Sequence, residues 1–190
     1  MGLQKMKIYT GIGAKLTPVD VLAKMEHYGE ILARLGYVLR SGAAPGADSA
    51  FESGCNRANG LKEIFLPYAG FNDSDSELYL ISEQVFDRAA SEYGPDWIQL
   101  DIDQKQKQAR NVQQVMGQNL NELTHFVICW TEDGCNTYQT RTKNTGGTGQ
   151  AIECASRQNV RVYNIRNDQD EKDLNAFIST QSSQEAKHPS

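Results

Sequence analysis

The chain has 190 residues, of which 39% are hydrophobic and 23% charged, so it is large enough for one domain with a full core. Its net charge of −5 argues against a sequence-independent nucleic-acid binder, which needs a basic face to neutralise phosphates. No segment reaches the roughly 20 apolar residues that span a bilayer, and the N-terminus lacks the apolar stretch of a signal peptide, so we expect a cytoplasmic protein with no membrane partner.

The cysteine and histidine patterns argue against a metal site. The four cysteines form no Cys-x-x-Cys pair, and the three histidines do not complete a zinc-ligand spacing. We therefore interpret the cysteines as reduced thiols, and we expect neither a metal nor a cofactor.

The N-terminal segment opens like a nucleotide-binding α/β fold. A short strand over 7–10 runs into a turn over 11–14 with glycines at 11 and 13, although Leu16 stands where a full Gly-x-Gly-x-x-Gly motif has its third glycine. Thr17 and Pro18 then predict the start of a helix, which apolar residues at helical spacing continue as far as residue 35.

A second turn of small residues follows the next strand, 37–39. It runs from Arg40 to Asp48 and leads into a helix from Ser49 to about Arg57. Asp48 is either a cap for this helix or a partner for a sugar hydroxyl. Arg40 is either a phosphate ligand or a strand-end cation.

The middle of the chain holds a long connection and a basic helix. A strand over 63–66 precedes the segment 67–103, whose length is typical of lids and binding loops and which contains a helix over 80–93. The helix predicted over 103–118 carries a basic cluster. Either this cluster belongs to a solvated face of the helix, or the helix places Arg110 and Asn111 against a ligand.

The strongest motif lies towards the C-terminus. Residues 124–130 form a near-continuous apolar run, typical of a central parallel strand. A polar loop, 131–143, leads to the glycine-rich segment 144–150, and an apolar helix follows from Ala151. A strand that leads through a glycine-rich turn into a helix N-terminus is an arrangement in which backbone amides face an anion. The alternative is an ordinary connection with an N-capping threonine.

Strands alternate with helices throughout, and a fifth strand and a last helix are predicted over 159–165 and 171–179. This order predicts one α/β domain, 1–179, with a Rossmann-like, doubly wound, mainly parallel sheet of five or more strands flanked by helices. Residues 180–190 are rich in Ser, Gln and Lys, and we expect a disordered tail there. All three small-residue turns then fall at the carboxyl edge of the sheet, which predicts a phosphate-bearing, nucleotide-like ligand.

Five motifs occur in a fixed order. They are Tyr9-Thr10-Gly11-Ile12-Gly13, the segment from Leu39 to Asp48, Ala109-Arg110-Asn111, the segment from Trp130 to Gly134, and the segment from Gly146 to Ala151. In this order they resemble the SLOG superfamily, and within it the stand-alone proteins of phages and bacteria related to DNA-processing protein A. The resemblance covers residues 7–165 and implies a nucleotide-binding domain that forms at least a dimer.

The resemblance implies three alternative functions. The first is an N-glycosidase of the Lonely-guy type, a phosphoribohydrolase that releases the base from a nucleoside 5′-monophosphate. The second is a sensor or sponge that binds a nucleotide signal, such as an ADP-ribose derivative, without turnover. The third is a single-strand-DNA-binding recombination mediator, which the acidic net charge disfavours.

The Lonely-guy type motif, Gly-Gly-x-Gly-Thr-x-x-Glu, implies the site residues. Gly146, Gly147, Gly149 and Glu153 match it, whereas Gln150 stands where the enzymes have Thr. The predicted catalytic pair is therefore Glu153 and Arg110. The predicted ligand-binding residues are Gly11, Gly13, Arg40, Ser41, Gly42, Gly46, Asp48, Asn111, Trp130, Thr131, Gly146, Gly147, Thr148, Gly149 and Gln150.

Overall fold

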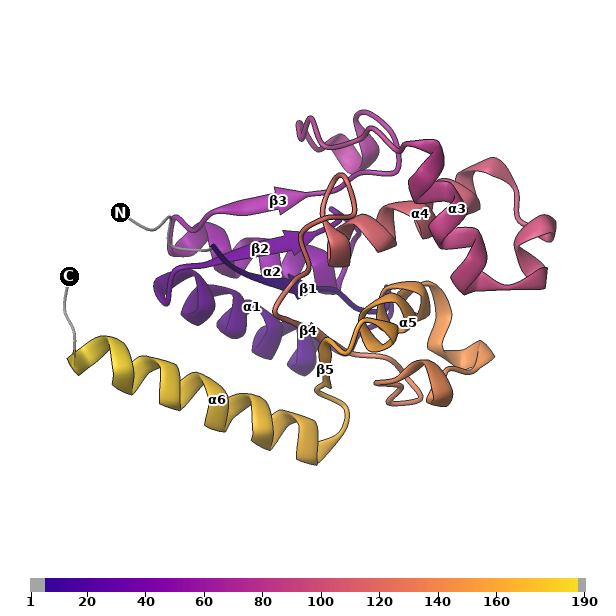
Figure 1. Ribbon diagram of the computed structural model, residues 1–190. Helices are drawn as coiled ribbons and strands as arrows, with labels where there is room; N and C mark the ends of the chain where they lie inside the picture. The colour runs from indigo at the N-terminus through magenta and orange to yellow at the C-terminus, as the bar shows by residue number, and fades with distance from the viewer. Residues whose placement is uncertain (1–5, 188–190) are drawn as a thin grey trace.

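The computed structural model describes residues 6–187, in which strands and helices alternate along the chain (Figure 1). The strands are β1 (Lys7–Gly11), β2 (Tyr37–Ser41), β3 (Lys62–Ile64), β4 (Phe126–Cys129) and β5 (Arg161–Asn164). The α-helices are α1 (Val19–Arg34), α2 (Ala47–Arg57), α3 (Glu83–Tyr93), α4 (Ile102–Met116), α5 (Gly149–Arg157) and α6 (Asp168–Lys187). Four short 3-10 helices join them, η1 (Phe71–Asp73), η2 (Pro95–Gln99), η3 (Tyr138–Thr140) and η4 (Lys143–Thr148).

The five strands form one sheet in the order β3-β2-β1-β4-β5, and every neighbouring pair is parallel. The predicted doubly wound α/β fold is therefore confirmed. The register places Tyr9 of β1 beside Leu39 of β2 and Phe126 of β4. The chain winds outwards in one direction from β1 to β3 and in the other direction from β4 to β5. The boundary between β1 and β4 is thus the topological switch point, where ligands bind in open α/β sheets.

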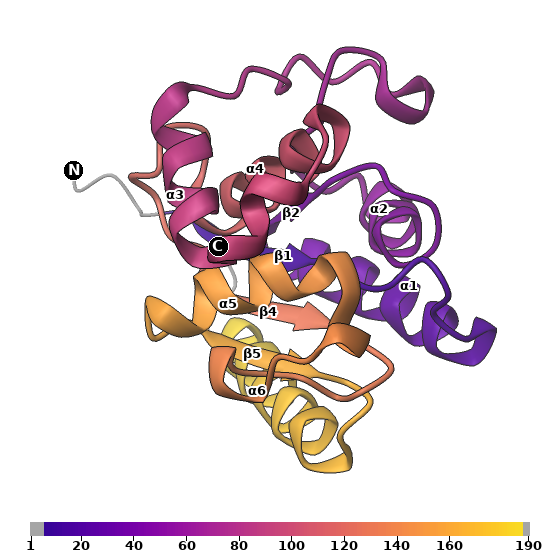
Figure 2. The same cartoon turned by 90° about the vertical axis from the view of Figure 1, so that its right-hand side faces the viewer.

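Helices cover both faces of the sheet, and alternate strand residues divide the core between them. Tyr9, Phe126 and Ile128 pack with α1, α2 and α6 in one buried cluster. Val127 and Val162 pack with α3, α4 and α5 in the other. Figure 2, which looks onto the carboxyl edge of the sheet, shows α3, α4 and α5 on one side and α1 and α2 on the other. No helix among residues 6–187 is both long enough and apolar enough to cross a bilayer.

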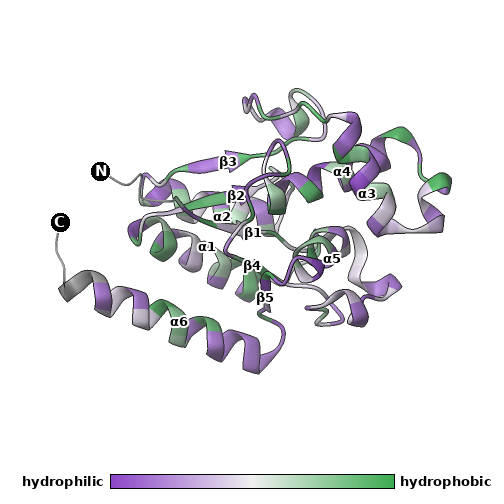
Figure 3. Cartoon of the chain, in the orientation of Figure 1, coloured by the Kyte–Doolittle hydropathy of each residue, from purple (hydrophilic) through white to green (hydrophobic). Residues whose placement is uncertain are grey.

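The C-terminal helix is longer than predicted. The helix expected over 171–179 runs from Asp168 to Lys187, so residues 180–187 are helical and the prediction of a disordered tail over them is wrong. Residues 188–190 lie outside the described part of the chain. The helix continues because no glycine or proline interrupts it before Pro189, while Leu174 and Ile178 anchor it in the core. Figure 3 shows a hydrophobic middle of this helix between hydrophilic turns.

The first helix begins without the predicted threonine cap. Pro18, rather than Thr17, is the N-cap residue of α1, and no side chain caps the helix. The Thr17 hydroxyl instead donates to the carbonyl of Ala14 at 2.6 Å. This bond closes the turn after β1, so the hydroxyl serves the loop rather than the helix.

Helices α1 and α2 cross in direct backbone contact at glycines. A Cβ atom at Gly54 of α2 would lie 1.9 Å from the carbonyl oxygen of Glu26 on α1, and a Cβ atom at Gly29 would lie 2.5 Å from the carbonyl oxygen of Phe51. Such distances are far inside van der Waals contact, so the crossing depends on the missing side chains. This close crossing sets where the N-terminus of α2 meets the carboxyl edge of the sheet.

We predict that Gly54→Ala destabilises the protein although alanine favours helix formation by about 1 kcal/mol over glycine. The added methyl group must push α1 and α2 apart, and we expect the free energy of unfolding to fall by about 2 kcal/mol or more. Urea denaturation measures it. Val19→Ala, at an exposed position of α1 away from the crossing, is the control and should change it by only about 0.5 kcal/mol or less. Equal or greater stability of Gly54→Ala would contradict the packing argument.

Candidate functional site

A cavity of about 750 Å³ opens at the carboxyl edge of the sheet, at the switch point between β1 and β4. Its walls come from the loop after β1, the turn after β2, the segment around η1, one face of α4, and the glycine-rich segment after β4. Its volume lies in the range of cavities that hold small molecules and cofactors. The lining residues are Ile12, Gly13, Ala14, Lys15, Leu16, Ala44, Pro45, Asp48, Phe71, Asn72, Lys107, Gln108, Arg110, Asn111, Gln114, Trp130, Glu132, Asn144, Thr145, Gly146, Gly147 and Thr148.

The glycine-rich segment is held rigidly at the cavity wall. The hydroxyls of Thr142 and Thr145 both donate to Oδ2 of Asp133 at 2.6 Å. Asn111 of α4 donates to the carbonyl of Gly147 at 2.9 Å. Gly146 has φ +66°, a left-handed conformation that glycine adopts without strain. These bonds hold the backbone of the segment open towards the cavity.

Asp133 organises this segment as an ionised carboxylate. Partial desolvation raises its pKa, but the hydrogen bonds from Thr142, Thr145 and Thr131 outweigh this effect and hold the pKa below its usual range. The N-cap residue of α5, Thr148, makes no side-chain cap bond. The alternative of a threonine-capped helix therefore does not apply to Thr148, and the first amides of α5 are not covered by a side-chain cap.

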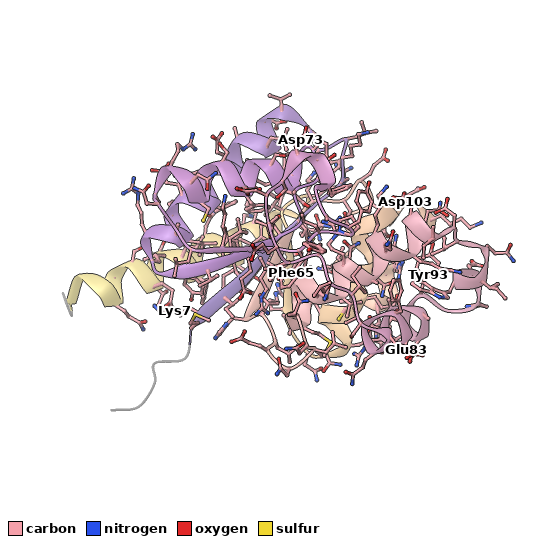
Figure 4. All side chains as sticks on the ribbon, turned by 90° about the horizontal axis from the view of Figure 1, so that it is seen from above. Lys7, Phe65, Asp73, Glu83, Tyr93 and Asp103 are labelled. Carbon is pink, nitrogen blue, oxygen red and sulfur yellow. The ribbon has the colours of Figure 1, made fainter. Side chains whose placement is uncertain are left out.

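Arg110 is the central cation of the cavity. Its side chain is 7% exposed, and its Nη1 donates to the carbonyl of Gly42 at 2.5 Å and to that of Phe65 at 3.4 Å. Figure 4 labels Phe65, near the middle of the molecule. Among the described residues Nε finds no acceptor. A buried guanidinium at the wall of a cavity is suited to an anionic ligand.

Asp48 is the buried carboxylate of the cavity. Its Oδ2 lies 3.8 Å from Nη1 of Arg110 and accepts a hydrogen bond from the amide of Ala44 at 3.3 Å. Desolvation on burial raises its pKa to about 6, against the lowering effect of Arg110 and of the Ala44 and Gly42 amides. The N-cap of α2 is Gly46, so the predicted capping role of Asp48 is not observed. The carboxylate faces the ligand space instead.

We predict a pH-dependent stability that Asp48→Asn removes. Because the carboxyl binds a proton more tightly in the folded state, unfolding free energy falls as pH rises from about 4 to about 6 and stays lower above that range. The loss amounts to roughly 3 kcal/mol at most. Urea denaturation from pH 4.5 to 7.5 checks this. If the unfolding free energy of the unmodified protein and of Asp48→Asn changed with pH in parallel, Asp48 would not titrate in this range.

Helix α4 contributes its residues to the cavity by helical spacing. Lys107 and Gln114 each lie three or four residues from Arg110 and Asn111, so these side chains share one face of the helix. Lys107 also pairs with Asp103 at 2.6 Å. Arg110 and Asn111, the two residues of this helix predicted to meet a ligand, both line the cavity. Lys107 and Gln114 were not predicted, although the same spacing identifies them.

Glu153 lies outside the cavity, contrary to its predicted position beside the ligand. Its Oε2 accepts from Arg141 at 2.6 Å, and its Oε1 accepts from Arg157 at 2.9 Å. Arg141 lies against the ring of Tyr93 at 5.4 Å. A Cβ atom at Gly149 would approach Nε of Arg141 to 2.7 Å. Glu153 thus holds Arg141 across the start of α5, which identifies it as a positioning residue.

The remaining predicted residues divide into two groups. Gly13, Asp48, Trp130, Gly146, Gly147 and Thr148 line the cavity together with Arg110 and Asn111. Gly11, Arg40, Ser41, Gly42, Gly46, Thr131, Gly149 and Gln150 do not. These eight residues support the walls, because each is a packing position or has at least one polar group bonded within the protein.

Three of the supporting residues show how the side chains are committed. Arg40, near the end of β2, is 1% exposed and pairs with Glu63 and Glu122, so its guanidinium is committed to ion pairs. Gln150 donates to the buried carboxylate of Glu92 at 3.1 Å. A Cβ atom at Gly42 would collide with Arg110. Gly42 therefore allows the buried guanidinium to reach its carbonyl.

Sequence reasoning missed the wall formed by the long connection after β3. Phe71 of η1 packs 5.7 Å from the guanidinium of Arg110, and Asn72 donates to the carbonyl of Ala43 at 2.8 Å. The length of segment 67–103 pointed to a binding loop, but no periodic pattern identified which of its residues reach the cavity.

We predict that Glu153→Gln lowers stability because it leaves Arg141 and Arg157 facing a neutral amide. The side chain of Glu153 is 9% exposed, so we expect a loss of about 1–3 kcal/mol in unfolding free energy. Thermal and urea denaturation measure it. Glu132→Gln, at an exposed residue of the cavity mouth, is the control. Equal stability of the two variants would exclude the positioning role.

Comparison of the chain with protein-family models, curated proteins and solved structures gives no match. Within residues 6–187 no group of three or more His, Cys, Asp or Glu side chains is arranged to hold a metal ion. The four cysteines are buried free thiols. The site is a cavity at the switch point of a parallel sheet, lined by cations, carboxylates and the glycine-rich segment.

Proposed function

We propose that the protein binds a nucleotide-derived small molecule, through its phosphate, in the cavity at the switch point. The observation that carries the proposal is Arg110, a buried cation among the residues that line the cavity, whose charge Asp48 at 3.8 Å compensates only in part. Lys15 and Lys107 add positive charge at the same cavity, and the glycine-rich segment adds backbone amides. This combination is suited to a phosphate group.

The geometry favours binding without turnover, as in a sensor or sponge. Hydrolysis of a glycosidic bond needs a carboxylate near the developing positive charge on the sugar. Both oxygens of Glu153, the residue implied for this role by the resemblance, are engaged by arginines outside the cavity. The carboxylate predicted for the N-glycosidase function, Glu153, is therefore committed to ion pairs. The likeness to the SLOG superfamily is part of the same proposal.

The first experiment identifies the ligand. The protein is incubated with nucleoside monophosphates, NAD, ADP-ribose and cyclic ADP-ribose isomers, and chromatography follows the solution and the heat-released bound fraction. We expect an intact nucleotide in the bound fraction. Free base that disappears with Glu153→Gln would establish the glycosidase instead, and no retained compound would contradict the proposal.

We also predict that Lys107→Gln weakens phosphate binding. Loss of one cation that contacts a phosphate should raise the dissociation constant of inorganic phosphate several-fold and reduce its dependence on salt. Isothermal titration calorimetry at two salt concentrations measures both. Lys105→Gln is the matched control, because Lys105 lies on the same helix against Trp97, outside the cavity. Equal effects of the two variants would count against the cavity as the binding site.

A further inference from the structure

The cavity holds a carboxylate that a simple phosphate site does not need. Asp48 is 4% exposed and lines the same cavity as Arg110 and Lys107. A negative charge in this position opposes the binding of an anion, and its burial is unfavourable in the absence of a strong partner. A phosphate-binding function alone therefore leaves Asp48 unexplained.

The partners of Asp48 inside the protein are two backbone amides and a distant arginine. The Ala44 amide donates to it at 3.3 Å, beyond the usual N–H···O range, the Gly42 amide is a second donor, and Nη1 of Arg110 is too distant at 3.8 Å for a hydrogen bond. Nη1 is directed to the carbonyls of Gly42 and Phe65 instead. An ionised carboxylate has about four acceptor sites, so Asp48 retains capacity for donors that a ligand brings.

We infer that Asp48 selects a ligand with vicinal hydroxyl groups beside its phosphate, and hence a ribose rather than a 2-deoxyribose phosphate. This inference rests on the proposed function, because it places the sugar next to the phosphate bound by Arg110. Two neighbouring hydroxyls donate to a carboxylate in the way that an acidic residue binds ribose in dinucleotide sites. The 3.8 Å separation of Asp48 and Arg110 puts the acceptor for the sugar beside the donor for the phosphate.

The surrounding walls support a sugar at this position. Asp48 stands in the first turn of α2, and the turn that precedes this helix contributes Ala44 and Pro45 to the same wall. Asn72 bonds to the carbonyl of Ala43 and holds the segment around η1 against that turn. Phe71, beside the guanidinium of Arg110, offers an apolar surface. The carboxylate is therefore held in a fixed position, as selection between two similar sugars requires.

The test compares matched ligands on the unmodified protein by calorimetry. Inorganic phosphate, ribose 5-phosphate, 2-deoxyribose 5-phosphate, AMP and 2′-deoxy-AMP are titrated under one set of conditions. We expect each ribose compound to bind about tenfold or more tightly than its deoxy counterpart, because the deoxy compound leaves a charged acceptor unpaired. Equal affinities within either pair would overturn the inference.

Variants separate the inference from the proposed function. Asp48→Asn should lower the ratio of ribose to deoxyribose affinity several-fold, since an amide oxygen accepts a weaker hydrogen bond than a carboxylate. It should leave phosphate binding unchanged or tighter. Asp87→Asn, an exposed carboxylate of α3 outside the cavity, should preserve the ratio. An unchanged ratio in Asp48→Asn overturns the inference alone, whereas failure of inorganic phosphate and every other ligand to bind overturns the proposed function with it.

Discussion

The buried guanidinium of Arg110 is the interaction on which the rest of the site depends. It extends from α4 to the carbonyl of Gly42 after β2 and to that of Phe65 after β3, and it lies 3.8 Å from Asp48 of α2. Four parts of the chain therefore meet at one cation. Burial lowers the pKa of this guanidinium and Asp48 opposes that effect, but arginine stays charged in proteins. The carbonyls and Asp48 compensate this charge only in part.

The topology explains why this meeting point is open. Connections leave β1 and β4 towards opposite ends of the sheet, so no helix crosses directly over the carboxyl ends of these two strands. The loops after β1 and β4 form the two sides of the gap, and α4 and the segment around η1 form its wall. The cavity is a direct consequence of the strand order, and the side chains determine what it binds.

A second group of charges stabilises the wall without facing the cavity. Glu153 holds Arg141 and Arg157, and nearby Glu92 holds Arg88 and Gln150 between α3 and α5. Burial raises the pKa of Glu92 despite the bond from Arg88. These pairs fix α5 and the glycine-rich segment relative to α3. The acidic residue that follows the glycine motif in the sequence thus supports the cavity from behind.

The sequence by itself determined the fold class, because apolar periodicity and alternating elements require a parallel sheet covered on both faces. It also placed the glycine-rich segment at the carboxyl edge, since that segment follows a strand, whereas for Arg110 and Asn111 it left a solvated helix face as the alternative. Only the tertiary structure decided that Arg40 and Glu153 are committed to ion pairs, and that Lys15, Phe71 and Asn72 reach the cavity. The physical reason is that a charged side chain takes whichever partner the packing brings within a few ångströms. Such partners come from distant segments, such as Glu122 for Arg40, which no local pattern encodes.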